Sequence, residues 1–307
     1  MAESLRGGVI GAGVFGGYHA RQYARLPGVT LSAVLDPHPE RAAKVAMESG
    51  GRAFHEMDAF LEAVDVVTIA SPATFHAEQA LAVIAAGKPV YIEKPIAISV
   101  ADAERVREAA AKKGLVVACG HQERVRFQAM GLLDVPEQPI RLEALRHGPP
   151  SDRSQDVSSV LDLMVHDLDL ALTLSTADPV TAEGEGRIGA SGSWDMARAE
   201  VSFEGGFMAL FDVSRMAEAR KRTMRVVFPS GEVEIDFLAG TFRNTTPFKL
   251  NADFEDTPAA KDPLGASVEG FLAAVRGHAP RAVVTADEAI RALDLALAVE
   301  QALEEHG

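Results

Sequence analysis

The sequence lacks several features that would each indicate a different class of protein. Cys119 is the only cysteine, which excludes an intrachain disulfide and a cysteine-based zinc site and fits a reducing cytoplasm. No run approaches the ~20 apolar residues of a membrane helix, and from the opening MAESLRGGVIGAG we expect no signal peptide. Basic residues are fewer than acidic ones, 30 against 44. The net charge of −14 disfavours general binding to nucleic acid or to an anionic membrane.

The length of 307 residues and a hydrophobic content of 47% predict a globular chain of two domains. The acidic charge is concentrated in one of them. Up to Gln122 the chain has 12 Lys and Arg against 13 Asp and Glu, whereas from Glu123 onward it has 18 against 31. We therefore predict domains over 1–122 and 123–307, and the closing helix can pack back on the first of them.

Strand and helix patterns alternate through the first domain. The candidate strands are continuous apolar runs, which is typical of parallel strands covered on both faces by crossover helices. The sequence thus predicts an α/β domain with strands at 8–11, 30–35, 52–55, 64–70, 90–92 and 115–118, and with helices at 14–26, 39–49, 74–86 and 100–113.

The pattern changes after Gln122 to helices and then successive strands. Two hairpins are predicted, with turns at 204–206 and 229–231. Helices are expected at 159–175, 264–277 and 285–305, so the second domain is α+β with an open, mostly antiparallel sheet. Helices suffice to cover only one face of that sheet, while 208–216 and 224–237 carry apolar residues on alternate positions. We therefore expect a homodimer or homotetramer joined sheet face to sheet face.

The first chemical motif is VIGAGVFG, in which Gly11, Gly13 and Gly16 have the G-x-G-x-x-G spacing between a strand and a helix. Gly11 allows a tight turn, Gly13 allows the backbone to approach a pyrophosphate, and Gly16 allows helix and strand to pack closely. Asp36 lies 20 residues further on, at the end of the next strand, where it would accept ribose hydroxyls and repel a 2′-phosphate. The motif predicts NAD rather than NADP; the alternative is a glycine turn beside a surface aspartate.

The second motif is Glu93-Lys94-Pro95, at the carboxyl end of a predicted parallel strand. Ligands of open α/β sheets bind at that edge. Lys94 is therefore a candidate to hydrogen-bond a substrate hydroxyl or a nicotinamide ribose, and the alternative is a solvated lysine at a strand end.

The third motif is the helix SVLDLMVHDLDLALTLS at 159–175. In a regular helix Asp162, His166, Asp169 and Thr173 share one stripe, and Asp167 points away from it. A carboxylate one turn from an imidazole orients it and stabilises its charged form, which suits a general base near pH 7. A polar helix face, a satisfied core histidine and a metal site on Asp162 and His166 remain alternatives.

Taken in order, GAGVFG, SPATFH, EKP and DLMVHDLD make the chain similar to the Gfo/Idh/MocA oxidoreductases over nearly its whole length. The resemblance implies that Lys94, Asp162 and His166 surround the nicotinamide and a sugar. It implies that Glu93 touches the nicotinamide-side ribose. His76 is either a packing residue or a direct contact. The cofactor residues are then Gly11, Gly13, Val14, Phe15, Gly16, Asp36, Ser71, Pro72, His76, Glu93, Lys94 and Gln122.

A narrower likeness, in GHQERVRF and in 146–170, is to the branch that oxidises the 3-hydroxyl of UDP-N-acetylglucosamine. Its diphosphate needs donors, and arginine gives bidentate contacts to phosphate. Four arginines flank the 159–175 helix in sequence, namely Arg124, Arg126, Arg146 and Arg153; the alternative is that they are ordinary surface residues. The substrate residues are then Lys94, Arg124, Arg153, Asp162, His166 and Asp169.

The expected reaction moves a hydride from a carbinol carbon to NAD, with His166 as base, Asp162 orienting it and Lys94 bonded to the reacting oxygen. Which of His166 and Lys94 accepts the proton stays open. Two other functions stay open as well. One is a dehydrogenase of a free sugar or inositol, and the other is a non-catalytic regulator that senses a dinucleotide.

Overall fold

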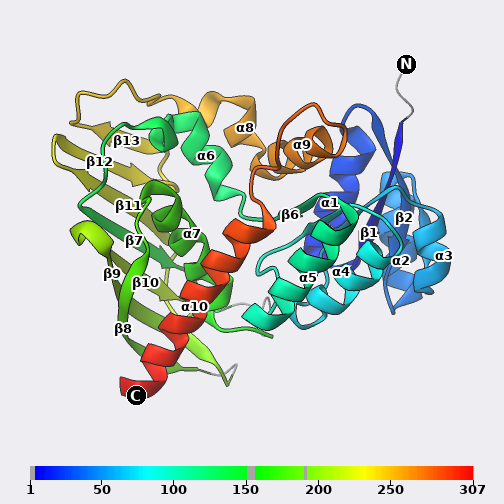
Figure 1. Cartoon of the computed structure of the whole chain (residues 1–307), viewed down its shortest axis with the longest axis horizontal. Helices are drawn as coiled ribbons and strands as arrows, with labels where there is room; N and C mark the ends of the chain where they lie inside the picture. The colour runs from blue at the N-terminus through cyan, green and yellow to red at the C-terminus, as the bar shows by residue number, and fades with distance from the viewer. Residues whose placement is uncertain (1–3, 151–155, 190–191, 307) are drawn as a thin grey trace. The chain divides into compact units, whose positions relative to one another are not determined.

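The computed structural model describes residues 4–150, 156–189 and 192–306, and the chain divides into two compact units. The first unit comprises 1–122 and 262–290, and the second comprises 123–261 and 291–307. Figure 1 shows the elements along the chain. The expected boundary after Gln122 coincides with this division, but residues 262–290, which we assigned to the second domain, belong to the first unit. Within the described residues, no helix combines the length and hydropathy needed to cross a membrane.

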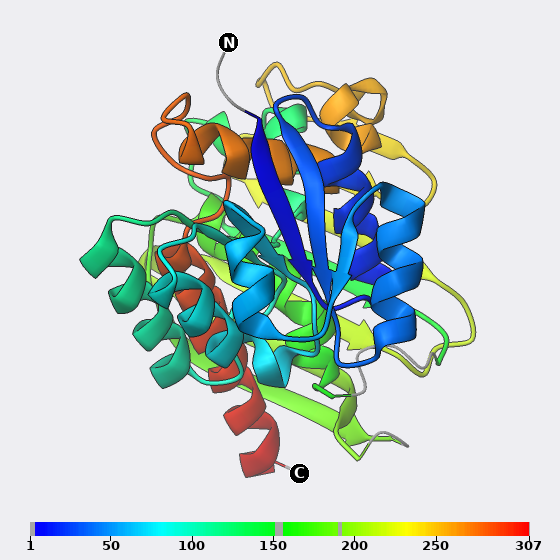
Figure 2. The same cartoon turned by 90° about the vertical axis from the view of Figure 1, so that its right-hand side faces the viewer.

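The first unit is built on a six-stranded parallel sheet in the order β3-β2-β1-β4-β5-β6 (Figure 2). This confirms the α/β prediction. Every residue of β4, β5 and β6 is buried, as expected of strands covered on both faces. The strands are β1 (Leu5–Ile10), β2 (Val29–Leu35), β3 (Arg52–Phe54), β4 (Val66–Ile69), β5 (Val90–Ile92) and β6 (Val117–Cys119). The helices are α1 (Val14–Arg25), α2 (Pro39–Ser49), α3 (Met57–Glu62), α4 (His76–Ala85), preceded by the 3₁₀ turn η1 (Ala73–Phe75), and α5 (Val100–Lys113).

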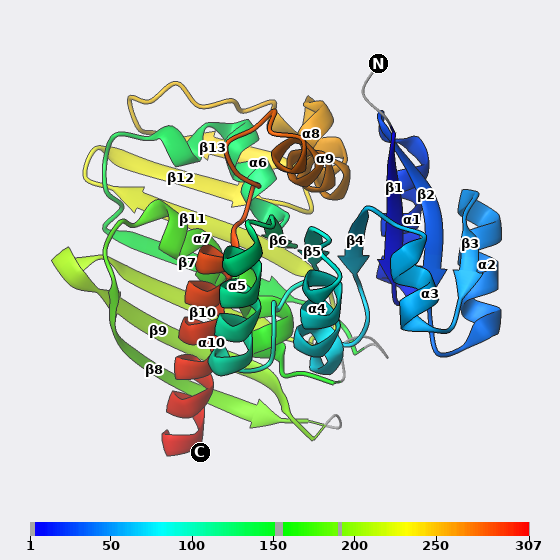
Figure 3. The same ribbon diagram turned by 45° about the vertical axis from the view of Figure 1, so that its right-hand side comes forward.

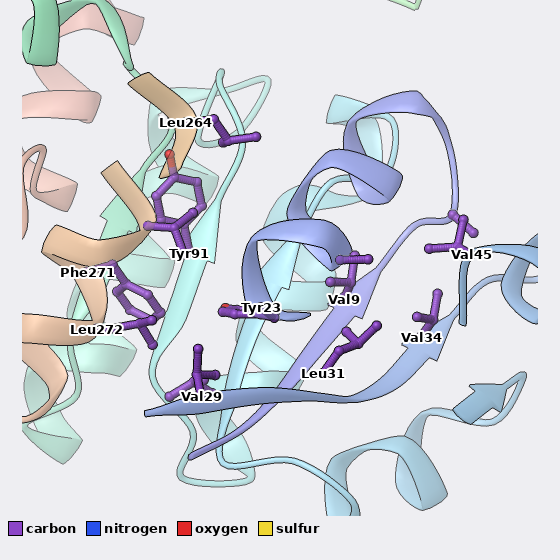
Figure 4. Packing of buried hydrophobic residues seen from close by; sticks show 14 of the residues in the cluster. Val9, Tyr23, Val29, Leu31, Val34, Val45, Tyr91, Leu264, Phe271 and Leu272 are labelled. Carbon is purple, nitrogen blue, oxygen red and sulfur yellow. The ribbon is translucent and has the colours of Figure 1, made fainter. Parts of the chain in front are cut away.

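The late segment joins this unit through helix α9 (Pro263–Val275). Phe271 and Leu272 of α9 pack into the same apolar cluster as Tyr23 and Tyr91, as Figure 4 shows. The Tyr91 hydroxyl also lies 3.0 Å from the Ser267 hydroxyl. The helix that packs on the first domain is therefore α9. The closing helix lies mostly in the second unit, which holds residues 291–307.

The second unit holds a seven-stranded sheet in the order β13-β12-β11-β7-β10-β9-β8 (Figure 3). Both predicted hairpins are present, and among the described strands of this sheet only the β7–β10 pair is parallel. The strands are β7 (Arg141–His147), β8 (Pro179–Ile188), β9 (Trp194–Phe203), β10 (Met208–Ser214), β11 (Lys221–Phe228), β12 (Gly231–Asp236) and β13 (Thr241–Asn244). The helical segments are α6 (Glu123–Met130), η2 (Leu132–Asp134), η3 (Val160–Met164), α7 (Val165–Leu174), η4 (Glu204–Gly206), η5 (Phe254–Asp256), α8 (Pro258–Lys261) and α10 (Ala286–His306), which crosses from the first unit into the second.

Helices α7 and α10 lie against one face of this sheet in both Figure 1 and Figure 3. Strands β9, β10 and β11 alternate buried residues with exposed or partly exposed ones, so each strand has one covered face. A hollow of about 1230 Å³ over the strands is lined mainly by exposed and partly exposed positions, among them Glu143, Arg198 and Arg225. These residues belong to ion pairs, including Arg225–Glu232 at 2.5 Å and Arg198–Asp212 at 3.0 Å. The second face of the sheet thus carries more charge than its apolar pattern predicted.

Candidate active site

The glycine turn after β1 has the geometry that its three roles require. Gly11 has φ +95°, and a Cβ there would lie 2.7 Å from the backbone of Ala70. A Cβ on Gly16 would lie 1.8 Å from the Gly11 carbonyl oxygen, so only glycine lets α1 begin this close to β1. Gly13, by contrast, has no atom within 4 Å of its Cβ position, and no side chain caps α1. The turn therefore leaves open space at a helix N-terminus, where backbone N–H groups bind phosphate.

Asp36 lies beside this turn, at the end of β2. One carboxylate oxygen accepts the Ala12 N–H at 2.7 Å, and the other accepts the His38 N–H at 2.8 Å. Each oxygen keeps acceptor capacity, because a carboxylate offers about four lone-pair sites. Val14 and Phe15 follow in the first turn of α1 and are 51% and 40% exposed. The structure thus brings these predicted cofactor residues together.

Glu93 and Lys94 follow β5 directly. The Glu93 side chain is buried, and His19 Nε2 lies 2.6 Å from its Oε1, which also accepts a hydrogen bond from Gln122 at 3.2 Å. Burial opposes ionisation, but the hydrogen bond and charge of His19, with Lys94 and His76, hold the pKa of the Glu93 carboxyl below its ordinary value. Lys94 is half-buried at the same edge of the sheet.

The segment Ser71-Pro72 follows β4, and His76 connects it to the Lys94-Pro95 segment. His76 is 1% exposed; its Nδ1 lies 2.7 Å from the Pro95 carbonyl oxygen and its Nε2 lies 2.9 Å from that of Ser71. The Ser71 hydroxyl donates to Gln79 at 2.6 Å. Both ring nitrogens of His76 thus face backbone oxygens, which favours its packing role over a direct contact.

These residues share one edge of the parallel sheet. Gly11, Asp36, Ser71 and Glu93 follow β1, β2, β4 and β5, and the strand order reverses between β1 and β4. Dinucleotides bind at this reversal in open α/β sheets. The open Gly13 turn offers backbone N–H groups that suit a pyrophosphate, and the Asp36 and Glu93 carboxylates offer acceptors that suit hydroxyls, so these residues fit NAD.

Asp162 and His166 lie where the predicted helix departs from regular geometry. Residues Val160–Met164 form a π-helical turn in which the Val165 N–H donates to the Val160 carbonyl, and α7 continues from there. Such turns are rare and often occur at functional sites. Asp162 and His166 are both half-buried. Among the described residues, no group of three or more His, Cys, Asp and Glu side chains could hold a metal ion.

The aspartates further along the helix form buried ion pairs. Arg124 of α6 binds Asp169 through two hydrogen bonds of 2.8 and 2.6 Å, with side chains only 5% and 1% exposed. Arg146 of β7 binds Asp167 in the same way, at 3.0 and 2.7 Å. Arg124 and Asp169, which we expected at the substrate, thus hold α7 to α6. The sequence showed charges flanking the helix, but it did not show that they pair with one another.

The remaining arginines have different surroundings. Arg126 is half-buried, with Nη1 at 3.8 Å from Glu255. Arg153 lies outside the described residues. Arg215, which we did not predict, follows β10, with Nη2 at 2.6 Å from Asp195 Oδ1 and Nη1 at 4.0 Å from Asp162 Oδ2. The sequence pattern did not single out Arg215, because a basic residue directly after a strand belongs to no motif of recognisable spacing.

His19 is the second residue that the sequence analysis missed. It is fully buried on α1 and bound to Glu93, 74 positions away. The sequence could have pointed to His19 only because a polar residue stands on the face of α1 that is buried against the sheet. Its partner, however, is fixed only by the packing of α1 against β5.

Comparisons with known proteins cover both units. A family model described as an oxidoreductase family with an NAD-binding Rossmann fold matches residues 5–121, and a model described as a GFO/IDH/MocA C-terminal domain matches 140–234. The UDP-N-acetylglucosamine 3-dehydrogenase of Acidithiobacillus ferrooxidans is 36% identical over 284 residues, 90% of each chain. A solved structure of that enzyme has a TM-score of 0.90 at 35% identity and covers 99% of both chains. The scyllo-inositol 2-dehydrogenase (NAD(+)) of Bacillus subtilis is 28% identical over 235 residues, 70% of this chain and 68% of the relative.

Proposed function

Because the chain belongs to the Gfo/Idh/MocA oxidoreductase family, with an NAD-binding Rossmann domain, we propose that it oxidises the 3-hydroxyl of UDP-N-acetylglucosamine to a ketone. It is an NAD-dependent dehydrogenase of the class that acts on sugar or nucleotide-sugar CH–OH groups. The match to the Acidithiobacillus enzyme along both units carries the choice of substrate, since the inositol dehydrogenase matches less of the chain. The ketone would serve an aminotransferase that makes a 3-amino sugar for a lipid A-type glycan.

In the proposed reaction, NAD supplies the hydride acceptor. His166 accepts the proton of the reacting hydroxyl, and Asp162 fixes the orientation and charge of that imidazole. Lys94 donates a hydrogen bond to the same oxygen and stabilises its developing negative charge. Asp36 supports NAD over NADP, because its carboxylate repels a 2′-phosphate.

The substrate is tested with purified protein, UDP-N-acetylglucosamine, N-acetylglucosamine and myo-inositol, each with NAD and NADP, by the absorbance of the reduced cofactor. We expect turnover with the nucleotide sugar and NAD, and little with the other two compounds. Equal rates with free sugar or inositol would replace the proposal by the second candidate, a dehydrogenase of free sugars or inositol, which the Bacillus relative favours.

The catalytic roles are tested by His166→Ala and Lys94→Ala, each of which should lower kcat by roughly 10²–10⁴ while NAD binding persists. Asp162→Asn acts on the same step, so it should combine less than additively with His166→Ala. Near-normal turnover of His166→Ala would assign the Asp162–His166 pair to structure alone.

The diphosphate site needs an arginine that is not already held in a buried pair. Arg153 is our first choice, because it precedes the helix that carries Asp162 and His166. Arg153→Ala should raise KM for the nucleotide sugar by about tenfold or more, since a charge-assisted bidentate contact is lost. The exposed Arg187 of β8 provides a control variant, Arg187→Ala, for which an unchanged KM is expected.

The assembly is proposed to be a cytoplasmic homodimer or homotetramer. Within the described residues, helices cover one face of the seven-stranded sheet, and the other face holds the hollow lined by Glu143 and Arg225. A second copy can cover that face and match its ion pairs. Sedimentation of a 32.6 kDa monomer at micromolar concentration would contradict this assembly.

A further inference from the structure

His19 occupies an unusual place for a polar side chain, in the core of the first unit. It is 0% exposed, and Nε2 donates to Glu93 Oε1 over 2.6 Å. Its ring lies 5.2 Å, centroid to centroid, from the ring of Tyr91. A buried imidazole is costly unless it is hydrogen-bonded, and the contact with Glu93 offsets that cost.

The hydrogen bonds to the Glu93 carboxylate are distributed unevenly. Both His19 Nε2 and Gln122 Nε2 donate to Oε1, at 2.6 and 3.2 Å. Oε2 lies over Gly120, where a Cβ would be only 2.7 Å away, so the backbone limits how the carboxylate can turn. Among the described contacts, Oε2 therefore keeps its capacity to accept a hydrogen bond.

The contact also joins two parts of the cofactor site. Helix α1, which carries His19, begins at the open Gly13 turn, and Glu93 lies at the carboxyl end of β5 directly before Lys94. A shift of α1 would therefore move the backbone N–H groups at its N-terminus, which suit a pyrophosphate, together with the Glu93 carboxylate. Burial works against the charge of Glu93, and His19 is the largest influence that offsets it, ahead of Lys94 and His76.

We propose that His19 is a positioning residue of the NAD site, which holds the Glu93 carboxylate in place through Oε1 and leaves Oε2 for a ribose hydroxyl of the cofactor. The assignment rests on NAD binding by the first unit and is independent of the sugar. Carboxylates at this edge of a Rossmann sheet accept ribose hydroxyls, and Glu93 can do so only while it is ionised and oriented.

The test is His19→Phe, which keeps a ring and removes the donor. We expect the Kd for NAD, measured by calorimetry at pH 8 without sugar, to rise roughly tenfold, as for a lost charge-assisted hydrogen bond. His19→Gln keeps an Nε2–H donor, so it should restore much of the affinity. If His19→Phe does not fold, His19→Met, which also lacks a donor, takes its place.

Tyr23→Phe is the matched control. Tyr23 lies on the same helix, is equally buried and makes a 2.9 Å hydrogen bond to Thr68 of β4. Loss of the Tyr23 hydroxyl removes a buried hydrogen bond between α1 and the sheet and leaves the contacts of Glu93 in place. We therefore expect Tyr23→Phe to lower the melting temperature and to leave the Kd for NAD unchanged.

The pH dependence of NAD binding separates positioning from packing. In the wild type the pKa of Glu93 is held below its ordinary value, so the Kd should stay constant between pH 5 and 8. Without His19, only Lys94 and His76 oppose the effect of burial, so the pKa of Glu93 should rise. NAD affinity should then weaken as the pH falls, because Glu93 becomes protonated. A His19→Phe protein with wild-type Kd and a flat profile would overturn the proposal, whatever its melting temperature and whichever sugar the enzyme oxidises.

Discussion

The ion pair between Arg124 and Asp169 decides whether Arg124 serves the substrate or the fold. Its two hydrogen bonds are 2.8 and 2.6 Å long, and the side chains are 5% and 1% exposed. Removing one partner of such a pair leaves an uncompensated buried charge, at a cost of about 3–5 kcal/mol. At roughly 2–4 °C per kcal/mol for a domain of 150–250 residues, Asp169→Leu should lower the melting temperature by roughly 6–20 °C.

Replacing both partners by apolar residues of similar volume is often neutral or stabilising. The double variant Arg124→Met/Asp169→Leu should therefore recover most of the stability that either single variant loses. The assay is thermal unfolding by circular dichroism of the two single variants and the double variant, together with KM for UDP-N-acetylglucosamine. A wild-type melting temperature of Arg124→Met together with a KM raised tenfold or more would contradict the structural role of this ion pair, because Arg124 would then bind the diphosphate.

The remaining predictions concern the glycine turn before α1, Asp36 and Glu300. Gly13→Ala should leave the melting temperature unchanged or slightly raised, because its Cβ position is open, but it should weaken NAD binding measured by calorimetry. Gly16→Ala should destabilise the fold by about 1–3 kcal/mol or more in denaturant titration, because its Cβ would lie 1.8 Å from the Gly11 carbonyl oxygen. Asp36→Ala should narrow the preference for NAD over NADP in kcat/KM, and a wild type that prefers NADP tenfold would contradict the role of Asp36. Burial raises the pKa of Glu300, so the folded state holds the carboxyl proton more tightly than the unfolded state does. The free energy of unfolding therefore falls as the pH rises above the ordinary pKa of a glutamic acid. Glu300→Gln should therefore raise the melting temperature at pH 7 and have little effect at pH 4; an equal gain at both values would contradict this.

Strand β8 shows where pattern analysis of the second unit failed. Its sequence, PVTAEGEGRI, carries two glycines and several charges, so it has little of the apolar character that predicts a strand. In the fold, a Cβ on Gly184 would lie 2.8 Å from the Arg198 carbonyl oxygen and 2.9 Å from Leu303. The glycine is thus needed for close packing against β9 and α10, and that requirement is visible only in three dimensions.

The helix of the third motif shows a similar limit. Its length and polar residues could be predicted, but the π turn at Val160–Met164 could not, because one added residue in a turn leaves no clear trace in apolar spacing. The helical spacing placed Asp167 away from the polar stripe and Asp169 on it. Their arginine partners lie 21 and 45 positions away, on β7 and α6, and so no local pattern could pair them.

The sequence by itself determined the features that depend on neighbouring residues. The apolar runs predicted the parallel strands, the glycine spacing predicted the turn before α1, and the two hairpins followed from their turn residues. Tertiary structure alone decided which surfaces those elements cover. An amphipathic helix such as α9 must bury its apolar face, but only packing placed Phe271 against Tyr91 in the first unit. The same holds for His19 and Glu93, since burial in a shared core, and no spacing along the chain, makes one the partner of the other.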